Sequence, residues 1–359
     1  MGRLIGIGTD FHGQASKLDN LVRTLPYGTN IYLAGDMYGP AERTFTESIK
    51  KEISGKSNDD FETEYFKGIY EAGKSNAPSH KKFIKDSSND TTKTIDSLLS
   101  RTVSHPVAGV IPGNGEVYHE EIWKSYSTDI KNPAQLFRES NLPYVESPVV
   151  HFYKNGERVE KVENVDTAVI LLPFTKTKKM DEKISKITGV AKEGYNKVQK
   201  AIYELIEENG VIDQIINANP KYIIQVQHEE PNSKNLARFF EPMPTENKEL
   251  YSRAIKEITK LKSLKGSRLA KHVILYGHID KGARFKQKMD VDGTLVDTLH
   301  IDEGKEFVLV DTITGKIYEP GEIPYSENSS ILTEADLQSV DEGSLEEMVS
   351  AEESSESAE

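Results

Sequence analysis

Five short segments of this chain carry side chains that can bind metal ions, and each one follows an apolar, β-rich run. The segments are Asp10-Phe11-His12-Gly13, Gly35-Asp36, Gly113-Asn114, His228 and Gly277-His278-Ile279-Asp280. Open α/β sheets bind their ligands at the carboxyl ends of the strands, so we expect these segments to converge on one point. Their carboxylate, amide and imidazole groups would supply seven oxygen and nitrogen donors there.

The number and kinds of these donors predict a site for two divalent metal ions. Asp36 is placed to bridge the ions, since each of its two carboxylate oxygens can bind one metal. One ion would also take Asp10, His12 and Asp280, and the other Asn114, His228 and His278. Mixed nitrogen and oxygen donors favour Mn, Fe, Zn or Ni over Ca but do not choose among the four. Of these metals we favour Mn. Two ions roughly 4 Å apart can activate a bridging water and clamp a phosphate ester during in-line attack.

Each segment has a simpler explanation when it is taken alone. Asp10 and His12 could be a helix cap beside a packed histidine, and Gly35-Asp36 is a common end of a strand. A single histidine such as His228 or His278 is more often structural than a metal ligand. The shared order and the shared position after a strand favour the metal site over these separate explanations.

Hydrophobic periodicity predicts the elements that would hold these segments. The expected strands are Leu4–Ile7, Ile31–Ala34, Val107–Ile111, Val149–Tyr153, Thr167–Leu172, Tyr222–Val226 and Val273–Tyr276. The expected helices are 14–25, 133–140, 191–208 and 248–264, and all but the short 133–140 show apolar residues at 3.6-residue spacing. Asn209-Gly210 is expected to end the helix at 191–208. Asn155-Gly156 predicts a hairpin, and period-two runs at 285–289, 295–299 and 307–310 predict antiparallel strands at the end of the fold.

Composition limits the classes of protein that remain. The chain has 359 residues and no cysteine, which excludes disulfides and thiolate metal sites. The segment Glu334 to Glu359 holds ten acidic residues and no Lys or Arg, which leaves 48 acidic against 45 basic residues elsewhere. That near-neutral body disfavours a nucleic-acid partner. The acidic segment, within a tail at 326–359, is expected to be disordered, either as a solubilising extension or as a binding site for a protein partner.

The sequence predicts one main domain and no segment that enters a membrane. Residues 1–325 would form one domain, with 40–103 as a helical insertion whose apolar content is thin for a core of its own. The start of the chain lacks the apolar region of a signal peptide, and no run of 18 apolar residues follows. We therefore expect a soluble, cytoplasmic protein with no membrane association.

The order Asp-x-His, Gly-Asp, Gly-Asn, His, Gly-His resembles the calcineurin-like metallophosphoesterase superfamily. The resemblance covers roughly Arg3 to Tyr318. It implies an α/β fold, a four-layer α/β/β/α sandwich with the site at the strand ends. It also implies a dinuclear phosphoesterase, a hydrolase in which a metal-bridging hydroxide attacks the ester. Asp36 and Asn114 are the catalytic candidates, and Lys281 and Arg284 either contact a substrate phosphate or stay in solvent.

Two residues depart from the pattern of this superfamily. Gly115 stands where a histidine commonly follows the Gly-Asn pair, and Asp280 stands where the last histidine is common. Asp280 keeps a metal donor. Gly115 removes the imidazole that would assist the leaving group, a contribution of about 10²- to 10⁴-fold for a general acid. Glu116 or His119 could substitute, although His119 also fits a plain helix residue.

Three classes of function remain open at this point. The favoured class is a metal-dependent phosphoesterase that prefers phosphodiesters to monoesters, because Gly115 opens the pocket and weakens assistance to the leaving group. The second is a binding or scaffold protein that keeps the fold with little catalysis. The third, a nuclease subunit, is disfavoured by the near-neutral body.

Overall fold

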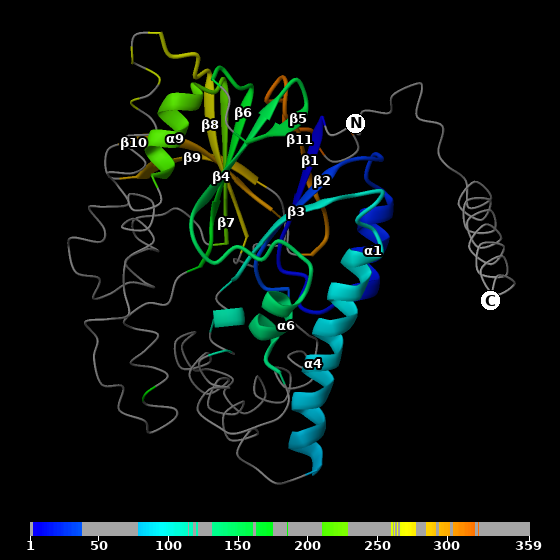
Figure 1. Cartoon of the computed structure of the whole chain (residues 1–359). Coiled ribbons are helices and arrows are strands. Elements are labelled where there is room, and N and C mark those ends of the chain that lie inside the picture. Colours follow the sequence, from blue (N-terminus) through cyan, green and yellow to red (C-terminus); the bar gives the residue numbers. More distant parts are fainter. Residues whose placement is uncertain are drawn as a thin grey trace, which may run out of the picture. The chain divides into compact units, whose positions relative to one another are not determined.

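The computed structural model describes residues 3–37, 78–113, 115–117, 120, 131–160, 163–174, 185, 210–228, 260, 262, 264, 266–277, 285–291, 294–301, 304–319 and 322. These residues form a mixed α/β fold with two sheets (Figure 1). The chain consists of two compact units, Met1–Ile323 and Pro324–Glu359, and every described helix and strand belongs to the first of them. The helix expected at 191–208, most of that at 248–264, residues 40–77 of the insertion and the acidic tail lie outside the described residues.

The first sheet has four strands in the order β11-β1-β2-β3. Strands β1 (Leu4–Gly8), β2 (Asn30–Ala34) and β3 (Val107–Ile111) run parallel, whereas β11 (Val308–Asp311) pairs antiparallel with β1. The parallel strands are apolar almost throughout because both faces of the sheet are buried. Because β1, β2 and β3 run parallel, their carboxyl ends meet at one edge of the sheet, where they are followed by Thr9, Gly35 and Pro112.

Three helices cover one face of this sheet. They are α1 (Ala15–Arg23), α4 (Pro78–Leu99) and α6 (Pro133–Glu139), and Figure 1 shows α1 and α4 side by side. Leu18, Val22, Ile95, Leu98 and Phe137 pack with residues of β2 and β3 in one buried cluster. Since β2 and β3 are parallel neighbours, the chain between them must cross back over the sheet, and α4 is part of that crossover.

The second sheet has seven strands in the order β5-β4-β6-β7-β8-β10-β9. Their bounds are β4 Val149–Lys154, β5 Glu157–Val159, β6 Thr167–Leu172, β7 Tyr222–Gln227, β8 Lys271–Tyr276, β9 Phe285–Val291 and β10 Thr294–His300. Strands β6, β7, β8 and β10 run parallel. The predicted Asn155-Gly156 hairpin is confirmed, with φ values of 53° and 85° at the turn, as is the antiparallel pair β9–β10.

Helix α9 (Val211–Ala218) was not expected from the sequence. Gly210 was interpreted as the end of the preceding helix, whereas here it is the residue before a new one, with φ 60°. Val211 and Ile215 pack with Ile223 and Ile274 on one face of the seven-stranded sheet. A glycine that allows positive φ can stand at either end of a helix, so its presence alone does not fix the boundary.

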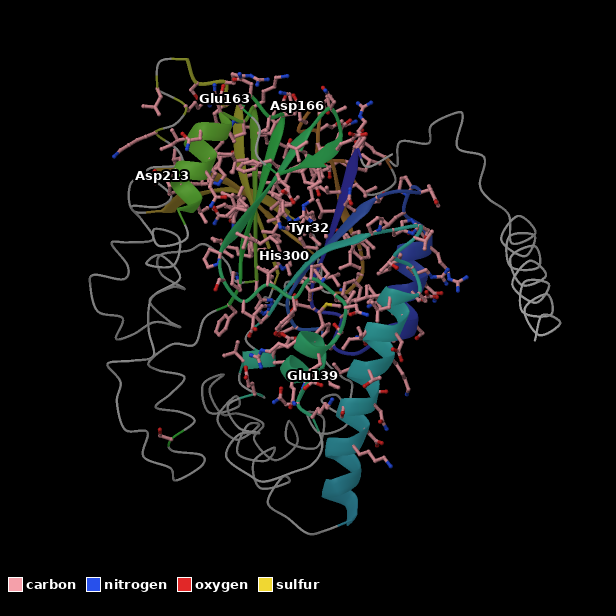
Figure 2. The ribbon with its side chains drawn as sticks, viewed as in Figure 1. Tyr32, Glu139, Glu163, Asp166, Asp213 and His300 are labelled. Carbon is pink, nitrogen blue, oxygen red and sulfur yellow. The ribbon has the colours of Figure 1, made fainter. Side chains whose placement is uncertain are left out.

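A third buried cluster draws on both sheets. It contains Ile5, Ile7 and Tyr32 from the four-stranded sheet together with Val169 and Leu275 from the seven-stranded one. The Tyr32 hydroxyl lies 2.7 Å from the hydroxyl of Tyr153 and 3.0 Å from Nδ1 of His151, and Figure 2 labels Tyr32 among the strands. These bonds tie β2 to β4 across the shared core, because buried polar groups are costly unless they are hydrogen-bonded. None of the described helices is long and apolar enough to cross a bilayer.

Candidate metal centre

Three of the seven predicted ligands meet in the described part of the chain. Asp10, Asp36 and His228 each offer one ligand atom, and these three atoms lie within 4.8 Å of one another. All three side chains are buried. Asp10 and Asp36 follow β1 and β2 of one sheet, and His228 follows β7 of the other, so both sheets contribute to the cluster. Two carboxylate oxygens and an imidazole nitrogen at this spacing could hold a metal ion.

The backbone at the strand ends is held in an uncommon conformation. Asp10, His12 and Asp36 have φ values of 56°, 45° and 52°, in the left-handed region that non-glycine residues rarely adopt. Backbone hydrogen bonds join the two loops, from Asp10 N to the Gly35 carbonyl (3.0 Å) and from His12 N to the Asp36 carbonyl (2.9 Å). Strain of this kind costs about 1–3 kcal/mol per residue and is concentrated at functional sites. Three of the predicted metal ligands, Asp10, His12 and Asp36, therefore have strained backbone conformations.

His228 is oriented by a backbone carbonyl. Its Nδ1 lies 2.8 Å from the carbonyl oxygen of Ala34, which can only accept, so Nδ1–H is the donor. Its other nitrogen, Nε2, lies 3.5 Å from Oδ2 of Asp36. Metal-binding histidines commonly donate their second ring N–H in this way, which fixes the tautomer and the ring orientation. His228 therefore has the arrangement of a metal-ligating imidazole.

Electrostatics show that the cluster favours a positive charge. Burial alone would lower the pKa of His228, but the carboxylates of Asp36 and Asp10 outweigh burial and raise that pKa to about 10. Burial raises the pKa of Asp10, and the neighbouring Asp36 raises it further. Without a metal, a proton is therefore held among these groups near neutral pH. A divalent cation would take its place, since metal binding requires neutral imidazole and ionised carboxylate.

Three glycines close around these side chains and leave no room for a larger residue. A Cβ at Gly113 would lie 2.2 Å from Oδ1 of Asp36, and one at Gly277 would lie 2.4 Å from Oδ2 of Asp10. A Cβ at Gly35 would lie 2.8 Å from Nδ1 of His228. Each glycine precedes a predicted ligand in the sequence, and its missing side chain lets the backbone approach the cluster.

Two further residues, Thr9 and Glu116, form hydrogen bonds with the cluster or with its backbone. The Thr9 hydroxyl lies 2.5 Å from Oδ2 of Asp10 and 3.0 Å from the Ala34 carbonyl. Glu116 is buried, and its carboxylate accepts hydrogen bonds from the backbone N–H groups of Asp36, Met37 and Gly113. Burial raises the pKa of Glu116, the Asp36 carboxylate raises it further, and the backbone N–H groups only partly oppose this, so it reaches about 7.

Gly115, the position where a histidine was expected, makes a backbone contact with the cluster. Its N–H donates to Oδ1 of Asp36 at 2.8 Å. One oxygen of Asp36 therefore accepts a hydrogen bond from the chain, while the other faces His228. A carboxylate oxygen has two lone pairs, so this bond still allows Oδ1 to bind a cation.

The remaining predicted residues divide into two groups. His12 lies beside the cluster, with its Nε2 4.0 Å from Oδ1 of Asp10. Outside the described residues lie Asn114, His119, His278, Asp280, Lys281 and Arg284. Sequence reasoning missed Thr9 altogether and considered Glu116 only as an acid. Their signal was position alone, since Thr9 directly precedes Asp10 and Glu116 lies two residues after Asn114.

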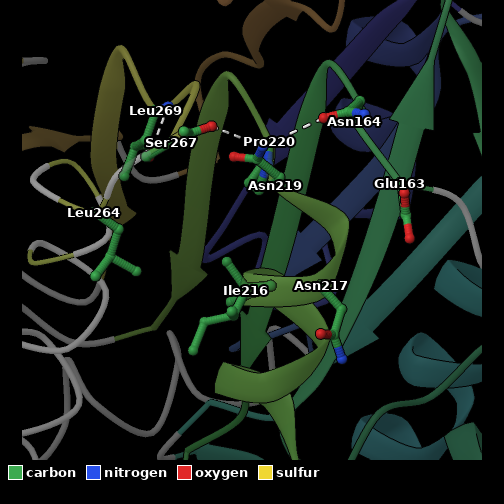
Figure 3. A pocket seen from close by; sticks show the side chains of 11 residues that line it. Glu163, Asn164, Ile216, Asn217, Asn219, Pro220, Leu264, Ser267 and Leu269 are labelled. Carbon is green, nitrogen blue, oxygen red and sulfur yellow. Dashed lines mark hydrogen bonds between the residues drawn. The ribbon is translucent and has the colours of Figure 1, made fainter.

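A pocket of about 330 Å³ lies at the amino ends of the parallel strands β6, β7 and β8 (Figure 3). The candidate metal centre lies at the carboxyl ends of the strands. It is lined by residues that precede β6, β7 and β8, among them Asn164, Asn219 and Ser267. Asn219 donates to Oδ1 of Asn164 and accepts from the backbone N–H of Arg268. Of the predicted ligands that the structure describes, none lines this pocket, so it is separate from the cluster of Asp10, Asp36 and His228.

Comparison with known proteins gives little further guidance. No family model matches the chain, and no curated protein does. Among solved structures, the crystal structure of TT1561 of Thermus thermophilus is similar, with 10% sequence identity and a TM-score of 0.33. The match covers 89% of this chain and 98% of the other. A TM-score that low supports no argument about fold or function.

Proposed function

We propose that this protein is a dinuclear metal-dependent phosphoesterase that prefers phosphodiesters to monoesters. The convergence of Asp10, Asp36 and His228 from strands of both sheets is the observation that carries the proposal. Two features support it. The left-handed backbone at Asp10 and Asp36 places these ligands at a cost in stability, and the hydrogen bond from His228 to the Ala34 carbonyl orients the imidazole. The sequence order of the segments, with its resemblance to the calcineurin-like metallophosphoesterases, supplies the class of chemistry.

The proposed ligands are Asp10, His12, Asp36, Asn114, His228, His278 and Asp280, with Asp36 as the bridge and Mn as the favoured metal. Gly113 and Gly277 support the inclusion of the residues that follow them, because each lies against a carboxylate of the described cluster. The corresponding fold would be the four-layer sandwich of the superfamily. Three buried clusters support it: one between the sheets, one beneath α1, α4 and α6, and one beneath α9.

The chemistry divides between the cations and the chain. Two divalent ions would supply Lewis acidity, which activates water as a nucleophile and neutralises charge on the phosphate ester. The protein's own part is to orient the donors and to exclude water from them. Ala34 and Thr9 do this for His228 and Asp10, and the buried position of Asp36 strengthens its electrostatic interactions.

The test is reconstitution of the full-length protein with Mn²⁺, followed by an assay with an activated aryl phosphodiester. We expect close to two ions per chain and metal-dependent turnover, both of which are lost in Asp36→Asn. The matched control is Asp311→Asn, since Asp311 is also buried but lies at the far end of β1, opposite Leu4. No metal after reconstitution, or turnover that survives Asp36→Asn, would reject the proposal.

A second candidate function is a metal-binding protein with little catalysis, and the contact at Gly115 favours it. That residue offers a backbone N–H to Asp36 and no acid for the leaving group. If a missing acid limits the rate, turnover should depend steeply on the leaving group, and Gly115→His should reduce that dependence. Equal, shallow dependence in both proteins would mean that another group supplies the proton. No turnover of any activated ester with both metals bound would favour the binding protein.

A further inference from the structure

The carboxylate of Glu116 accepts hydrogen bonds from three backbone N–H groups next to the candidate metal centre. Its Oε2 accepts from the N–H groups of Asp36 (2.9 Å) and Gly113 (2.8 Å), and its Oε1 accepts from Met37 (2.6 Å). The residue is 1% exposed. Asp36 and Met37 follow β2, whereas Gly113 follows β3, so one carboxylate joins two neighbouring strand-end loops.

These contacts reach the candidate metal centre through the backbone. Asp36 has φ 52°, and the N–H that Glu116 binds belongs to that strained residue. Gly113 lies so close to Asp36 that a Cβ there would overlap Oδ1. A hydrogen bond from a backbone N–H to a carboxylate is roughly twice as strong as a neutral one. Three such bonds can hold a left-handed residue that would otherwise relax.

We propose that Glu116 is a positioning residue, which fixes the Asp36 carboxylate for metal binding by joining the loops after β2 and β3. This role rests on the proposed metal centre but not on its catalysing hydrolysis. It also differs from the role of a general acid, because both oxygens of Glu116 accept from the backbone in the described structure. Glu116 acts on the metal only through Asp36 and Gly113.

The test compares Glu116→Gln with the wild type in the full-length protein, with Mn²⁺ alone as the probe. The amide offers one acceptor oxygen in place of two and turns an N–H₂ group toward backbone donors. We expect Mn²⁺ affinity to fall by about 10- to 100-fold, the usual cost of losing a group that orients a ligand. The absorption bands of the Co²⁺-loaded protein should also shift, because the displaced Asp36 changes the coordination.

A matched control separates positioning from general stability. Asp311 is also 1% exposed and accepts from the backbone N–H groups of Ile313 and Thr314, but at the other end of the sheet. Asp311→Asn should lower the melting temperature while it leaves the Mn²⁺ affinity and the Co²⁺ bands as in the wild type. If Glu116→Gln does not fold, Glu116→Asp keeps both oxygens but withdraws them by one methylene. It should also weaken Mn²⁺ binding.

The outcomes distinguish this role from the proposed function. A folded Glu116→Gln or Glu116→Asp with wild-type affinity and spectrum overturns the positioning role. Lower turnover at unchanged affinity overturns it too, and assigns Glu116 to the leaving group. A wild type that binds Mn²⁺ without hydrolysing any ester, while Glu116→Gln binds it more weakly, rejects the hydrolase and keeps the positioning role. A wild type that binds no Mn²⁺ rejects both.

Discussion

Buried carboxylates at the two ends of the parallel strands have different charged neighbours. At the amino end, Arg3 donates from Nε to Asp311 at 2.7 Å, and Lys221 lies 3.2 Å from Asp166, which Figure 2 labels at that end. At the carboxyl end, Asp10 and Asp36 face each other and His228. Burial acts on both ends, and at the amino end the protein supplies its own cations, Arg3 to Asp311 and both Lys221 and Arg268 to Asp166.

The pKa values record this difference. Burial would raise the pKa of Asp311, but Arg3 and the N–H groups of Ile313 and Thr314 outweigh it and lower that pKa. For Asp10, burial and the nearby Asp36 outweigh the histidines, and its pKa is raised. The same residue type is thus stabilised as an anion at one end and destabilised at the other. A carboxylate in the second situation gains most from a cation that comes from solution.

Replacing one aspartate at each end should have the largest effect and tests the comparison directly. Asp36→Asn should weaken Mn²⁺ binding by more than about 100-fold, since even groups that only orient ligands cost 10- to 100-fold when they are lost. Asp311→Asn should leave Mn²⁺ affinity unchanged. Calorimetric titration of the metal-free proteins measures both. Similar losses in the two variants would mean that general destabilisation, and not ligand loss, governs binding.

A second prediction concerns the glycines at the carboxyl end. Gly277→Ala would place a Cβ 2.4 Å from Asp10 and 2.5 Å from Thr9, so the loop must move. We expect a loss of about 1–3 kcal/mol in the free energy of unfolding, as in overpacked interiors, together with weaker Mn²⁺ binding. Denaturant unfolding and metal titration measure these changes.

The control for this steric effect is Gly210→Ala. Gly210 has a positive φ, 60°, which Gly277 does not, but a Cβ at Gly210 would meet nothing within 4 Å. Its cost should be limited to the backbone, about 1–2 kcal/mol, and Mn²⁺ affinity should not change. Weaker metal binding in Gly210→Ala, or unchanged binding in Gly277→Ala, would contradict the idea that contact with Asp10 is what requires glycine.

A third prediction follows from the proton that the metal must displace. The pKa of His228 is raised from 6.5 to about 10, so the folded metal-free protein holds a proton between these values that the unfolded chain releases. That stabilisation is fully present below pH 6.5 and is lost as pH rises toward 10. Mn²⁺ affinity should increase by about tenfold per pH unit where one proton is displaced.

Titrations at pH 6.5, 7.5 and 8.5 check this prediction. The melting temperature of the metal-free protein should fall across the same range, and the Mn²⁺-loaded protein should not show that fall. Asp311, whose pKa is lowered from 3.8, contributes nothing to either trend at these pH values. An affinity that is independent of pH would show that His228 is already neutral in the metal-free cluster.

Local sequence patterns were sufficient for much of this fold. Apolar runs predicted β1, β2, β3, β6, β7 and β8, and Asn155-Gly156 predicted the hairpin between β4 and β5, because each pattern reports local backbone preference and burial. The mixed α/β class is confirmed. Local patterns did not predict α9, because Gly210 was interpreted as the end of the preceding helix and a glycine with positive φ can stand at either end. The four-layer arrangement stays a prediction.

The candidate site was predictable in its residue types but not in its geometry. The sequence order brought Asp10, Asp36 and His228 together as potential ligands because each follows a strand. Their left-handed backbone, the Ala34 carbonyl on His228 and the role of Glu116 could not be predicted. Those features depend on contacts between segments up to 194 residues apart, which local patterns do not encode.

The smallest expected effect comes from Arg3, the cation at the amino end. Its side chain is 57% exposed, whereas that of Asp311 is 2% exposed, so solvent screens the pair from one side. Arg3→Gln should cost about 1 kcal/mol or less in the free energy of unfolding, as measured for exposed ion pairs, and should not change Mn²⁺ affinity. Asp311 keeps the N–H groups of Ile313 and Thr314 in that variant, which limits the loss. A large loss of stability would show that Asp311 depends on its cation as strongly as the carboxyl end is proposed to depend on metal. The two ends would then differ only in where the cation comes from. Weaker Mn²⁺ binding in Arg3→Gln would show instead that β1 transmits a change at its start to Asp10 at its end.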